Sequence, residues 1–301
     1  MKIKVLLNPY SNRWNSKKRW PIAESALRAA GVDFELSVSE RADHLVELAA
    51  DAVRQGFTTL IVAGGDGSIG EVINGATRGW FETSLFPITL GILPLGTAND
   101  LSDNIGIPRD LSAVAKMIAK GKTRHVDLCK CNERYFLNNS AAGLEPYVTT
   151  KQEKINWISG VPRYLVAAVQ GIMDQPNWNA KMQWDGGSYD GPLSLVSVGN
   201  GQRTGGVFFM TPHANPFDGK LTFIHGYRST RLKMFQALPA AMKPGKGNMV
   251  EMDGIHEIHC TYLKFKLDKP SPAHTDGEIF DSWLTDFDYK IFPSAVPMIV
   301  P

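Results

Sequence analysis

The chain has 301 residues, of which 43% are hydrophobic and 21% are charged, and its formal net charge is +2. This length can bury a sizeable core in two domains or one large one, and the composition is ordinary for a soluble globular protein. The small net charge excludes no class of partner by itself, and we expect no nucleic-acid partner. No apolar run could span a membrane and the chain begins with a strand instead of a signal peptide. Three cysteines form no disulfide framework, so we expect a cytoplasmic protein.

Apolar runs alternate with helical patterns in the first part of the chain. The runs predict strands at residues 2–7, 33–38, 59–63 and 89–94, of which 59–63 and 89–94 are expected to be buried. The helical patterns lie after a basic cluster, with apolar positions Ile22, Ala26, Leu27 and Ala30, and then at residues 43–55 and about 69–78. This alternation, which continues to about residue 125, predicts a doubly wound, mainly parallel sheet.

Three of these strands end in polar loops, at residues 8–12, 64–68 and 96–100. Ligands of such sheets bind beyond the carboxyl ends of the strands. We therefore expect the three loops to meet at one edge and to form a ligand site, and this argument depends on no family.

The loop at residues 64–68 reads Gly-Gly-Asp-Gly-Ser between a buried strand and a helix. Glycines allow positive φ angles and close approach of the backbone to a ligand, and free N–H groups at a helix start favour an anion such as phosphate. Asp66 would repel a phosphate unless a divalent cation lay between them. The pattern predicts a nucleotide polyphosphate with Mg²⁺. An ordinary strand-to-helix turn with an acidic N-cap is the alternative.

Beyond about Asp127 the pattern changes to short alternating stretches separated by glycine and proline turns. It predicts an antiparallel β domain, a sandwich, with helices near residues 161–174 and 229–242. The predicted strands are residues 135–139, 180–184, 193–198, 220–226, 257–267 and 283–287. We therefore expect two domains, residues 1–127 and 128–301, packed closely with a cleft between them.

Three polar clusters of the second domain have candidate chemistry. A glycine-rich loop at residues 199–206 follows a buried strand. The turn at residues 215–220 could hold a hard cation through Asp218 and carbonyl groups, or be an ordinary Asp-Gly turn. Asp276 and Glu278 could supply a general base for a hydroxyl, or belong to a surface turn.

Two further features bear on lipids. The apolar helix at residues 161–174 is expected in the core, with the wall of a lipid-tail pocket as the alternative. Between Gly219 and Val250 there are six basic residues and no acidic one, which suits either an anionic bilayer surface or a solvated face. These basic residues are Lys220, Arg228, Arg231, Lys233, Lys243 and Lys246.

Together these motifs resemble the diacylglycerol kinase catalytic-domain family, and within it the bacterial soluble lipid kinases, which are related to sphingosine and ceramide kinases. The most specific parts are the turn at residues 64–68 with Glu71, Asn74 and Gly75, and the Leu-Pro-Leu-Gly-Thr-Ala-Asn-Asp run at residues 93–100. Supporting parts, in the family's order, are residues 8–11, 199–201, 218–219 and 276–278. The resemblance covers essentially the whole chain.

The resemblance implies a phosphofructokinase-like α/β domain, a β-sandwich domain and a last segment that returns to the first domain. It implies ATP- and Mg²⁺-dependent phosphorylation of a lipid hydroxyl, with a diacylglycerol-like acceptor. Contact with the lipid at a membrane surface would be transient and peripheral, and the oligomeric state, including a homo-oligomer, is left open.

The resemblance also implies roles for individual residues. Nucleotide-binding residues would be Asn8, Pro9, Ser11, Asn12, Ser39, Gly64, Gly65, Asp66, Gly67, Ser68, Glu71, Asn74, Gly96, Thr97, Asn99 and Asp100. Asp66, Asp100 and Asp127 would organise Mg²⁺ through water. A structural Mg²⁺ would lie at Asn215, Asp218 and Lys220. Glu278 matches the family's proton acceptor, with Asp276 beside it and Asp66 as a further catalytic carboxylate.

Three positions depart from the family's pattern. Asn12 stands where glycine is usual, Ser68 replaces threonine, and Lys220 stands where an apolar residue is usual. Two alternatives remain: an NAD kinase, which shares the Gly-Gly-Asp-Gly turn, and a non-catalytic lipid- or nucleotide-binding regulator on the same fold. The acceptor is also open, because diacylglycerol, phosphatidylglycerol, sphingoid bases and undecaprenol-like alcohols all present a hydroxyl at the head of an apolar body.

Overall fold

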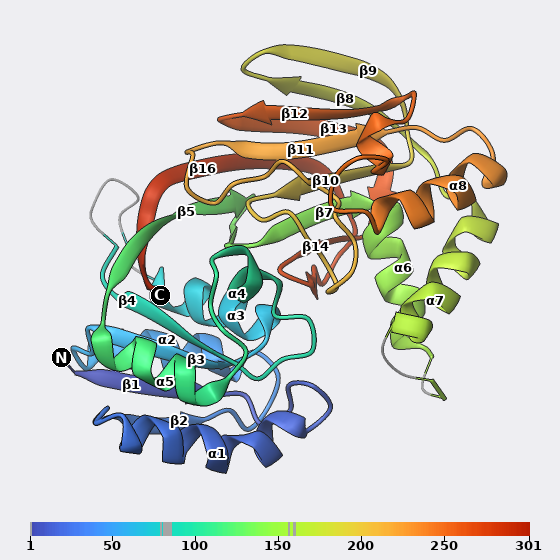
Figure 1. The fold of residues 1–301 in the computed structure, drawn as a ribbon. Helices are drawn as coiled ribbons and strands as arrows, with labels where there is room; N and C mark the ends of the chain where they lie inside the picture. The colour runs from blue at the N-terminus through green and yellow to red at the C-terminus, as the bar shows by residue number, and fades with distance from the viewer. Residues whose placement is uncertain (1, 79, 81–85, 156, 159–160) are drawn as a thin grey trace.

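The computed structural model describes residues 2–78, 80, 86–155, 157–158 and 161–301. Figure 1 shows two parts, an α/β part built by the first third of the chain and a part of antiparallel strands with a group of helices on one side. Both ends of the chain lie at the α/β part (Figure 1).

The strands of the α/β part are β1 (Ile3–Leu7), β2 (Glu35–Val38), β3 (Thr59–Gly64) and β4 (Thr89–Pro94). They are parallel and lie in the order β2-β1-β3-β4. The helices are α1 (Asn15–Ala29), α2 (His44–Arg54), α3 (Asp66–Ala76), α4 (Asp100–Asn104) and α5 (Leu111–Lys120). The predicted parallel sheet is confirmed, and β3 is buried along its whole length, as its apolar sequence indicates.

Helix α1 packs on the core through Ala26, Leu27 and Ala30 as expected, but not through Ile22. Trp20, Ala23 and Leu27 are buried, whereas Ile22 is 63% exposed. The Trp20 ring packs edge-on against Phe34, with the ring centres 6.2 Å apart. Residues three and four apart share one side of a helix, so the burial of Trp20 turns Ile22 towards solvent. The expectation for Ile22 is wrong because the sequence offers two apolar stripes and tertiary contacts select one.

The second part has strands β5 (Thr123–Cys131), β6 (Arg134–Phe136), β7 (Asn139–Gly143), β8 (Trp178–Trp184), β9 (Gly187–Leu193), β10 (Leu195–Gly199), β11 (Leu221–Gly226), β12 (Ile255–Cys260), β13 (Tyr262–Ser271), β14 (Ala273–Thr275), β15 (Glu278–Ile279) and β16 (Leu284–Ile299). A six-stranded sheet has the order β12-β11-β10-β7-β14-β15. A ten-stranded sheet continues from β4 through β16, β13 and β8 to β9, with β5 beside β16 and β6 beside β5. The predicted antiparallel β domain is confirmed.

The last strand joins the two parts of the molecule. β16 pairs antiparallel with β13 and β5, and its residue Met298 pairs in parallel with Leu90 of β4. Val296 and Ile299 belong to the same apolar core as the strands of the α/β part. One sheet therefore runs through both parts and holds them in a defined relation (Figure 1).

The stretch 257–267, predicted as one strand, belongs to two strands in different sheets. β12 ends at Cys260, and β13 begins at Tyr262. Between them, Thr261 donates its N–H and its hydroxyl to the carboxylate of Asp185, both at 2.9 Å. This contact lies at the corner between the sheets, and the alternating sequence pattern runs through the corner without a break.

Three α-helices lie beside the β sheets: α6 (Leu144–Glu153), α7 (Val161–Asp174) and α8 (Arg231–Ala241). The last two confirm predictions, whereas α6 was not expected, since it has few apolar residues and a proline, Pro146, in its first turn. The expected core position of α7 holds for Ala167 and Ala168, but Val169 and Met173 are 44% and 52% exposed. The described ranges include no helix long and apolar enough to cross a membrane.

Candidate active site

The three polar loops predicted to share one edge of the sheet do meet there. Asn8 Nδ2 donates to Ser68 Oγ at 3.0 Å, and Ser11 Oγ lies 3.2 Å from the same atom. Thr97 Oγ1 donates to Asn12 Oδ1 at 3.1 Å, which joins the third loop to the first. The convergence expected at the carboxyl ends of β1, β3 and β4 is therefore confirmed.

Two glycines allow the second and third loops to touch. A Cβ on Gly96 would overlap the backbone of Gly65 and would lie 2.7 Å from Asn99 Oδ1. The carbonyl of Gly64 accepts the N–H groups of Leu95 and Gly96, both at 2.9 Å. A side chain at Gly96 would force the loops apart, so packing requires glycine here.

The first loop keeps its backbone shape without the glycine that is usual in the family. Asn12, Arg13 and Trp14 have φ angles of 53°, 51° and 70°, all in the left-handed region. Asparagine tolerates this region better than most residues because its short polar side chain can form local hydrogen bonds. Asn12 is therefore a conservative replacement at this position.

Asp66 joins the glycine turn to the third loop. It is half-buried in the first turn of α3, and its carboxylate accepts the N–H groups of Asp100 and Leu101, each at 3.0 Å. Burial raises the pKa of the Asp66 carboxyl above its ordinary value, although these N–H donors act in the opposite direction. Asp66 thus anchors the start of α4, and its negative charge is disfavoured by burial.

Asp100 carries a second carboxylate beside Asp66, and Arg203 binds it. Arg203 Nε donates to Asp100 Oδ1 at 2.6 Å, and the Arg203 guanidinium also pairs with Asp103. The N–H of Gly206 donates to both Asp100 oxygens. Burial and the nearby Asp66 charge raise the pKa of Asp100 to about 6, and Arg203 opposes this rise. Negative charge therefore gathers where Asp66 and Asp100 meet.

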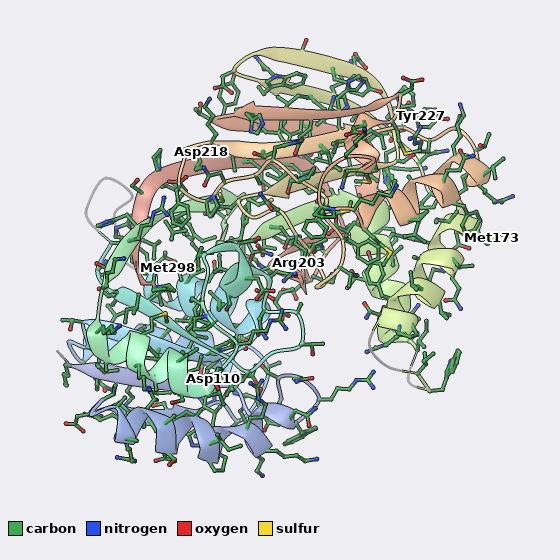
Figure 2. The ribbon with its side chains drawn as sticks, in the orientation of Figure 1. Asp110, Met173, Arg203, Asp218, Tyr227 and Met298 are labelled. Atoms are coloured by element: carbon green, nitrogen blue, oxygen red, sulfur yellow. The ribbon has the colours of Figure 1, made fainter. Side chains whose placement is uncertain are left out.

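Arg203 was not among the predicted site residues. Figure 2 shows it where the α/β part meets the β sheets. The sequence held one indication that Arg203 belongs to the site. Arg203 is the basic residue of the glycine-rich loop 199–206, which follows the end of β10. The sequence did not indicate which acidic residue it would meet.

Asp276 lies in the turn between β14 and β15 and is buried. Its carboxylate accepts the N–H groups of Leu137, Asn138 and Asn139 at 3.0, 2.9 and 3.0 Å. Burial raises the pKa of Asp276 to about 7, although these donors lower it. Asp276 and Gly277 have φ angles of 48° and 89°, so two successive left-handed residues make a tight turn.

Glu278 follows this turn and reaches the glycine loop of the α/β part. A Cβ on Gly67 would overlap the Glu278 carboxylate, and one on Gly70 would lie 3.3 Å from the Cβ of Asp276. The start of α3 therefore has glycine at both positions where the turn between β14 and β15 approaches it. The structure brings Asp276 and Glu278 onto the Gly-Gly-Asp-Gly-Ser turn.

Glu71 and Asn74, predicted to bind nucleotide, make contacts between structural elements. Glu71 Oε2 accepts the N–H of Leu45 in the first turn of α2 at 3.1 Å. Burial, and secondly the negative charge of Glu278, raise the pKa of Glu71 to about 7. Asn74 donates to the carbonyl of Tyr135 at 2.8 Å and accepts its N–H at 2.9 Å. A further bond to a carbonyl of α3 leaves the whole Asn74 amide engaged. These bonds fasten α3 to β6, and the contact of Asn74 with a nucleotide stays a prediction.

Pro9, Ser39 and Asn99 lie buried around the joined loops. Ser39 Oγ donates to the carbonyl of Arg41 at 2.9 Å, and Asn99 Nδ2 donates to the carbonyl of Gly96 at 3.0 Å. Within the described ranges, Asn99 Oδ1 is buried without a hydrogen-bond partner. Such an oxygen is suited to accept a bond from a ligand or a water.

Direct contacts link Asp127 to the turn at residues 215–220 instead of to Asp66 and Asp100. Its carboxylate accepts the N–H groups of Gly219 at 2.7 Å and Ser294 at 2.6 Å. Burial raises the pKa of Asp127, and the neighbouring Asp218 adds to this rise. Asp127 therefore belongs with the second predicted cation site (Asp218 is labelled in Figure 2).

The turn at residues 215–220 is closed by its own side chains. Asn215 Oδ1 accepts the N–H of Phe217 at 3.2 Å, and Asp218 Oδ1 accepts the N–H of Lys220 at 2.9 Å. Among the residues that the structure describes, no group of three or more His, Cys, Asp or Glu side chains is placed to hold a metal, at this turn or elsewhere. Any cation at this turn would depend on backbone carbonyls beside Asp218.

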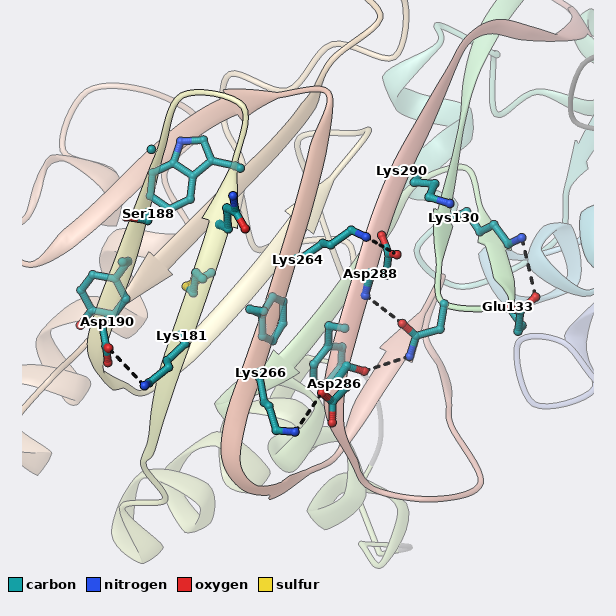
Figure 3. Close-up of a pocket in the computed structure, with 18 residues that line it drawn as sticks. Lys130, Glu133, Lys181, Ser188, Asp190, Lys264, Lys266, Asp286, Asp288 and Lys290 are labelled. Atoms are coloured by element: carbon teal, nitrogen blue, oxygen red, sulfur yellow. Dashed lines mark hydrogen bonds and ion pairs between the residues drawn. The ribbon is translucent and has the colours of Figure 1, made fainter.

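A hollow of about 1100 Å³ lies over the ten-stranded sheet and is lined by residues of β5, β8, β9, β13 and β16 (Figure 3). None of the residues of the joined loops lines it. Its charged side chains pair with one another. Lys264 Nζ lies 3.0 Å from Asp288, Lys266 Nζ lies 3.4 Å from Asp286, and Lys181 is paired with Asp190. These ion pairs account for the charged residues on this open sheet face, so their presence does not call for a ligand.

The joined phosphate-type loops and the carboxylates brought to them by a β domain define a phosphotransferase of the kinase class. The model of the diacylglycerol kinase catalytic domain matches residues 2–131, and that of the YegS C-terminal NAD kinase beta sandwich-like domain matches residues 139–300. The chain belongs to the diacylglycerol kinase family and is a lipid kinase.

Individual relatives agree with this family. The chain is 29% identical over 222 residues to diacylglycerol kinases of Staphylococcus aureus strains bovine RF122 / ET3-1 and MRSA252, covering 73% of this chain and 69% of each relative. A crystal structure of a diacylglycerol kinase from Bacillus anthracis str. Sterne covers 100% of this chain and 97% of its own, with a TM-score of 0.74 and 21% identity. A second structure from the same organism has a TM-score of 0.79 at 22% identity. At these identities the two structures support the fold alone.

Proposed function

We propose that this lipid kinase transfers the terminal phosphoryl group of ATP to the hydroxyl of a diacylglycerol-like lipid, with Mg²⁺ bound. One observation carries the proposal: the carboxylate of Glu278 lies against Gly67, within the turn whose sequence is typical of phosphate binding. A carboxylate at this position can accept the proton of an attacking hydroxyl.

The joined loops fit a nucleotide. Gly65 and Gly96 meet with bare backbone, the N–H groups at the start of α3 favour phosphate oxygens, and Thr97 is exposed beside them. The unpartnered Asn99 Oδ1 offers one further acceptor. ATP supplies the phosphoryl group, and the loops at residues 8–12, 64–68 and 96–100 bind and orient it.

Glu278 is the proposed proton acceptor, and Asp276 positions it. Glu278 is exposed, so an incoming hydroxyl can reach it. Asp276 is buried and held by three backbone N–H groups, which keeps the turn between β14 and β15 against α3. A rigidly held turn maintains the short distance between base and phosphate loop that proton transfer requires.

Asp66 and Asp100 fit a divalent cation held through water. Asp100 is buried and Asp66 is half-buried, and burial raises the pKa of each carboxyl, so negative charge at this place is poorly balanced by solvent. A nearby cation would relieve this imbalance. Mg²⁺ at this place would neutralise charge on the transferred phosphoryl group. A separate structural Mg²⁺ is proposed at Asn215, Asp218 and the Lys220 carbonyl, with Asp127 behind them.

The helices enclose an apolar cavity that is smaller than a lipid tail, so they would have to move apart to admit the apolar body of the acceptor. A cavity of about 70 Å³ lies among α6, α7, α8 and β10, and apolar side chains such as Val148, Ile172 and Met234 line most of it. A second, more polar cavity of about 470 Å³ extends from Glu145 and Tyr164, which line both cavities, to Thr97 of the nucleotide loops. A lipid could thus place its tail among the helices and its hydroxyl near the phosphate turn.

Peripheral binding to an anionic bilayer is proposed for the ends of α7 and α8. Leu232 and Met173 are 68% and 52% exposed, and Arg231 Nε donates to the carbonyl of Met173 at 2.9 Å, which places these apolar side chains in one region. Arg231 and Lys233 flank them, as expected of a surface that meets anionic headgroups. Arg228 makes no contribution, because it is buried.

The test is transfer of label from ATP in the presence of Mg²⁺, with lipids in mixed micelles and NAD offered in parallel. Label in a lipid, lost in Glu278→Ala while ATP binding is kept, supports the proposal. Label in NAD would establish the NAD kinase alternative. Label in neither acceptor, with ATP or lipid still bound, would favour a non-catalytic regulator.

A further inference from the structure

A histidine and a glutamate form a buried pair at the point where the two cavities meet. Glu145 is in the first turn of α6, and His274 is in β14. His274 Nε2 lies 3.2 Å from Glu145 Oε1, and the two residues are only 3% and 6% exposed. Because both side chains are polar and almost completely buried, their remaining polar atoms need partners.

Those remaining atoms have no partner in the described part of the chain. Glu145 Oε2 and His274 Nδ1 are both buried without a hydrogen bond. Both residues line the cavity of about 470 Å³ that also contains Thr97 and Gly277. Two unsatisfied buried atoms on a cavity that reaches the nucleotide loops indicate a site for a polar ligand group.

The chemistry of the two atoms limits that group. A carboxylate oxygen such as Glu145 Oε2 only accepts hydrogen bonds. When a neutral His274 ring donates its Nε2–H to Glu145 Oε1, the other ring nitrogen, Nδ1, is an acceptor. The pair then presents two acceptors, and the matching ligand group is a hydrogen-bond donor.

Glu145 also lines the apolar cavity among α6, α7 and α8. A lipid whose tail enters that cavity would place its head group beside the pair. Diacylglycerol has a single hydroxyl, which is the group phosphorylated, and its ester oxygens are acceptors that would meet the pair's acceptors. A second hydroxyl on the head group supplies one O–H, which one of the two acceptors can accept.

We propose that Glu145 and His274 bind a second hydroxyl of the acceptor's head group, so that the enzyme selects lipids with a diol head over diacylglycerol. This inference rests on the proposed lipid kinase function. It makes Glu145 and His274 specificity-determining residues, distinct from the carboxylates at the glycine turn.

The test compares 1-monooleoylglycerol, which has two hydroxyls, with 1,2-dioleoylglycerol, which has one, in the same mixed micelles with ATP. The double variant Glu145→Leu with His274→Leu removes both acceptors and leaves an apolar pair, a change that folded proteins often tolerate. Since one hydrogen bond to a charged group is worth about 1.5–3 kcal/mol, the ratio of kcat/KM for the two lipids should fall at least about tenfold.

A matched control is Glu257→Gln, which alters the surface pair that Glu257 forms with His213 and should leave the ratio unchanged. An unchanged ratio in the double variant would overturn the proposal. If the wild-type protein phosphorylates no lipid, the proposed function fails separately. In that case the binding of a fluorescent monoacylglycerol is measured for the wild-type protein, the double variant and the control. Weaker binding by the double variant, but not by the control, supports the pair as a head-group site, and equal binding by all three rejects it.

If the double variant does not fold, the isosteric variant Glu145→Gln takes its place. Its amide replaces one acceptor oxygen by a donor while keeping the shape of the side chain. The same fall in the ratio is expected, smaller in size, and equal ratios again reject the proposal.

Discussion

The carboxylate of Glu278 occupies the space that a side chain at Gly67 would need. These residues come from opposite parts of the molecule, one from the start of α3 and the other from β15. A glycine in the phosphate turn therefore serves two purposes: it leaves room for a ligand, and it admits the proposed base from the neighbouring domain.

Gly67→Ala should reduce phosphoryl transfer without unfolding the protein. The added methyl group displaces the end of a flexible side chain, and alanine favours a helix over glycine by up to about 1 kcal/mol, so stability should be equal or higher. We expect kcat to fall at least about tenfold with ATP affinity largely kept, measured by turnover and by calorimetric ATP binding. Gly245→Ala, where the new Cβ meets open space, is the control. Full activity in Gly67→Ala would contradict the assigned place of Glu278.

Gly96→Ala should separate the second and third loops. The new Cβ would meet the backbone of Gly65, which cannot move aside as a flexible side chain can. Overpacking of this kind typically costs about 1–3 kcal/mol. Chemical denaturation should show a loss of this size, and ATP affinity should fall with it. If Gly96→Ala keeps its stability and its ATP affinity, as the control Gly245→Ala should, the two loops can move apart without loss and the prediction is wrong.

Arg203→Gln should loosen the joint between the two parts. Arg203 binds Asp100, which is almost fully buried, and the loss of a hydrogen bond to a charged group costs about 1.5–3 kcal/mol. The pKa of Asp100 should rise further, since Arg203 now opposes the effect of burial. The matched control is Arg109→Gln, which removes an exposed pair with Asp103 and should cost less than about 1 kcal/mol. Equal losses of unfolding free energy in the two variants would refute the structural role of Arg203.

Glu71→Gln should change how stability depends on pH. Burial and Glu278 raise the pKa of Glu71 from 4.5 to about 7 in the folded protein. The folded state thus holds a proton that the unfolded state releases, so this contribution to stability is full below pH 4.5 and is lost as pH rises through about 7. Glutamine keeps an acceptor for the N–H of Leu45 and has no proton to lose. Urea unfolding between pH 5 and about pH 8 should show a smaller decline of stability in the variant, and parallel curves would disprove the assignment.

Mg²⁺ should stabilise the wild-type protein through the turn at residues 215–220. A ligand that binds the folded state alone raises the melting temperature with its concentration. Asp218→Asn should abolish the part of this rise that the structural site provides, without ATP present. Asp190→Asn, which alters an exposed pair on another sheet, should leave it intact. A full Mg²⁺ response in Asp218→Asn would exclude this turn as the site.

The sequence by itself determined the parallel strands, the helices that follow the first three of them, and the three loops at one edge. These follow from local patterns: apolar runs define buried strands, and glycines with a following helix define the phosphate-type turn. The Gly-Gly-Asp-Gly-Ser turn and the later Asp-Gly-Glu turn were recognisable for the same reason, since each is a continuous stretch.

Only the tertiary structure decided which side chains meet. The pairing of β16 with β4 and β5 sets the relation of the two parts, and through it Glu278 reaches Gly67. The engagement of Asn74 by β6, the grouping of Asp127 with residues 215–220 and the exposure of Ile22 also depend on distant contacts. Such contacts are set by sheet register and by competition among alternative packings, and no local pattern of residues specifies either.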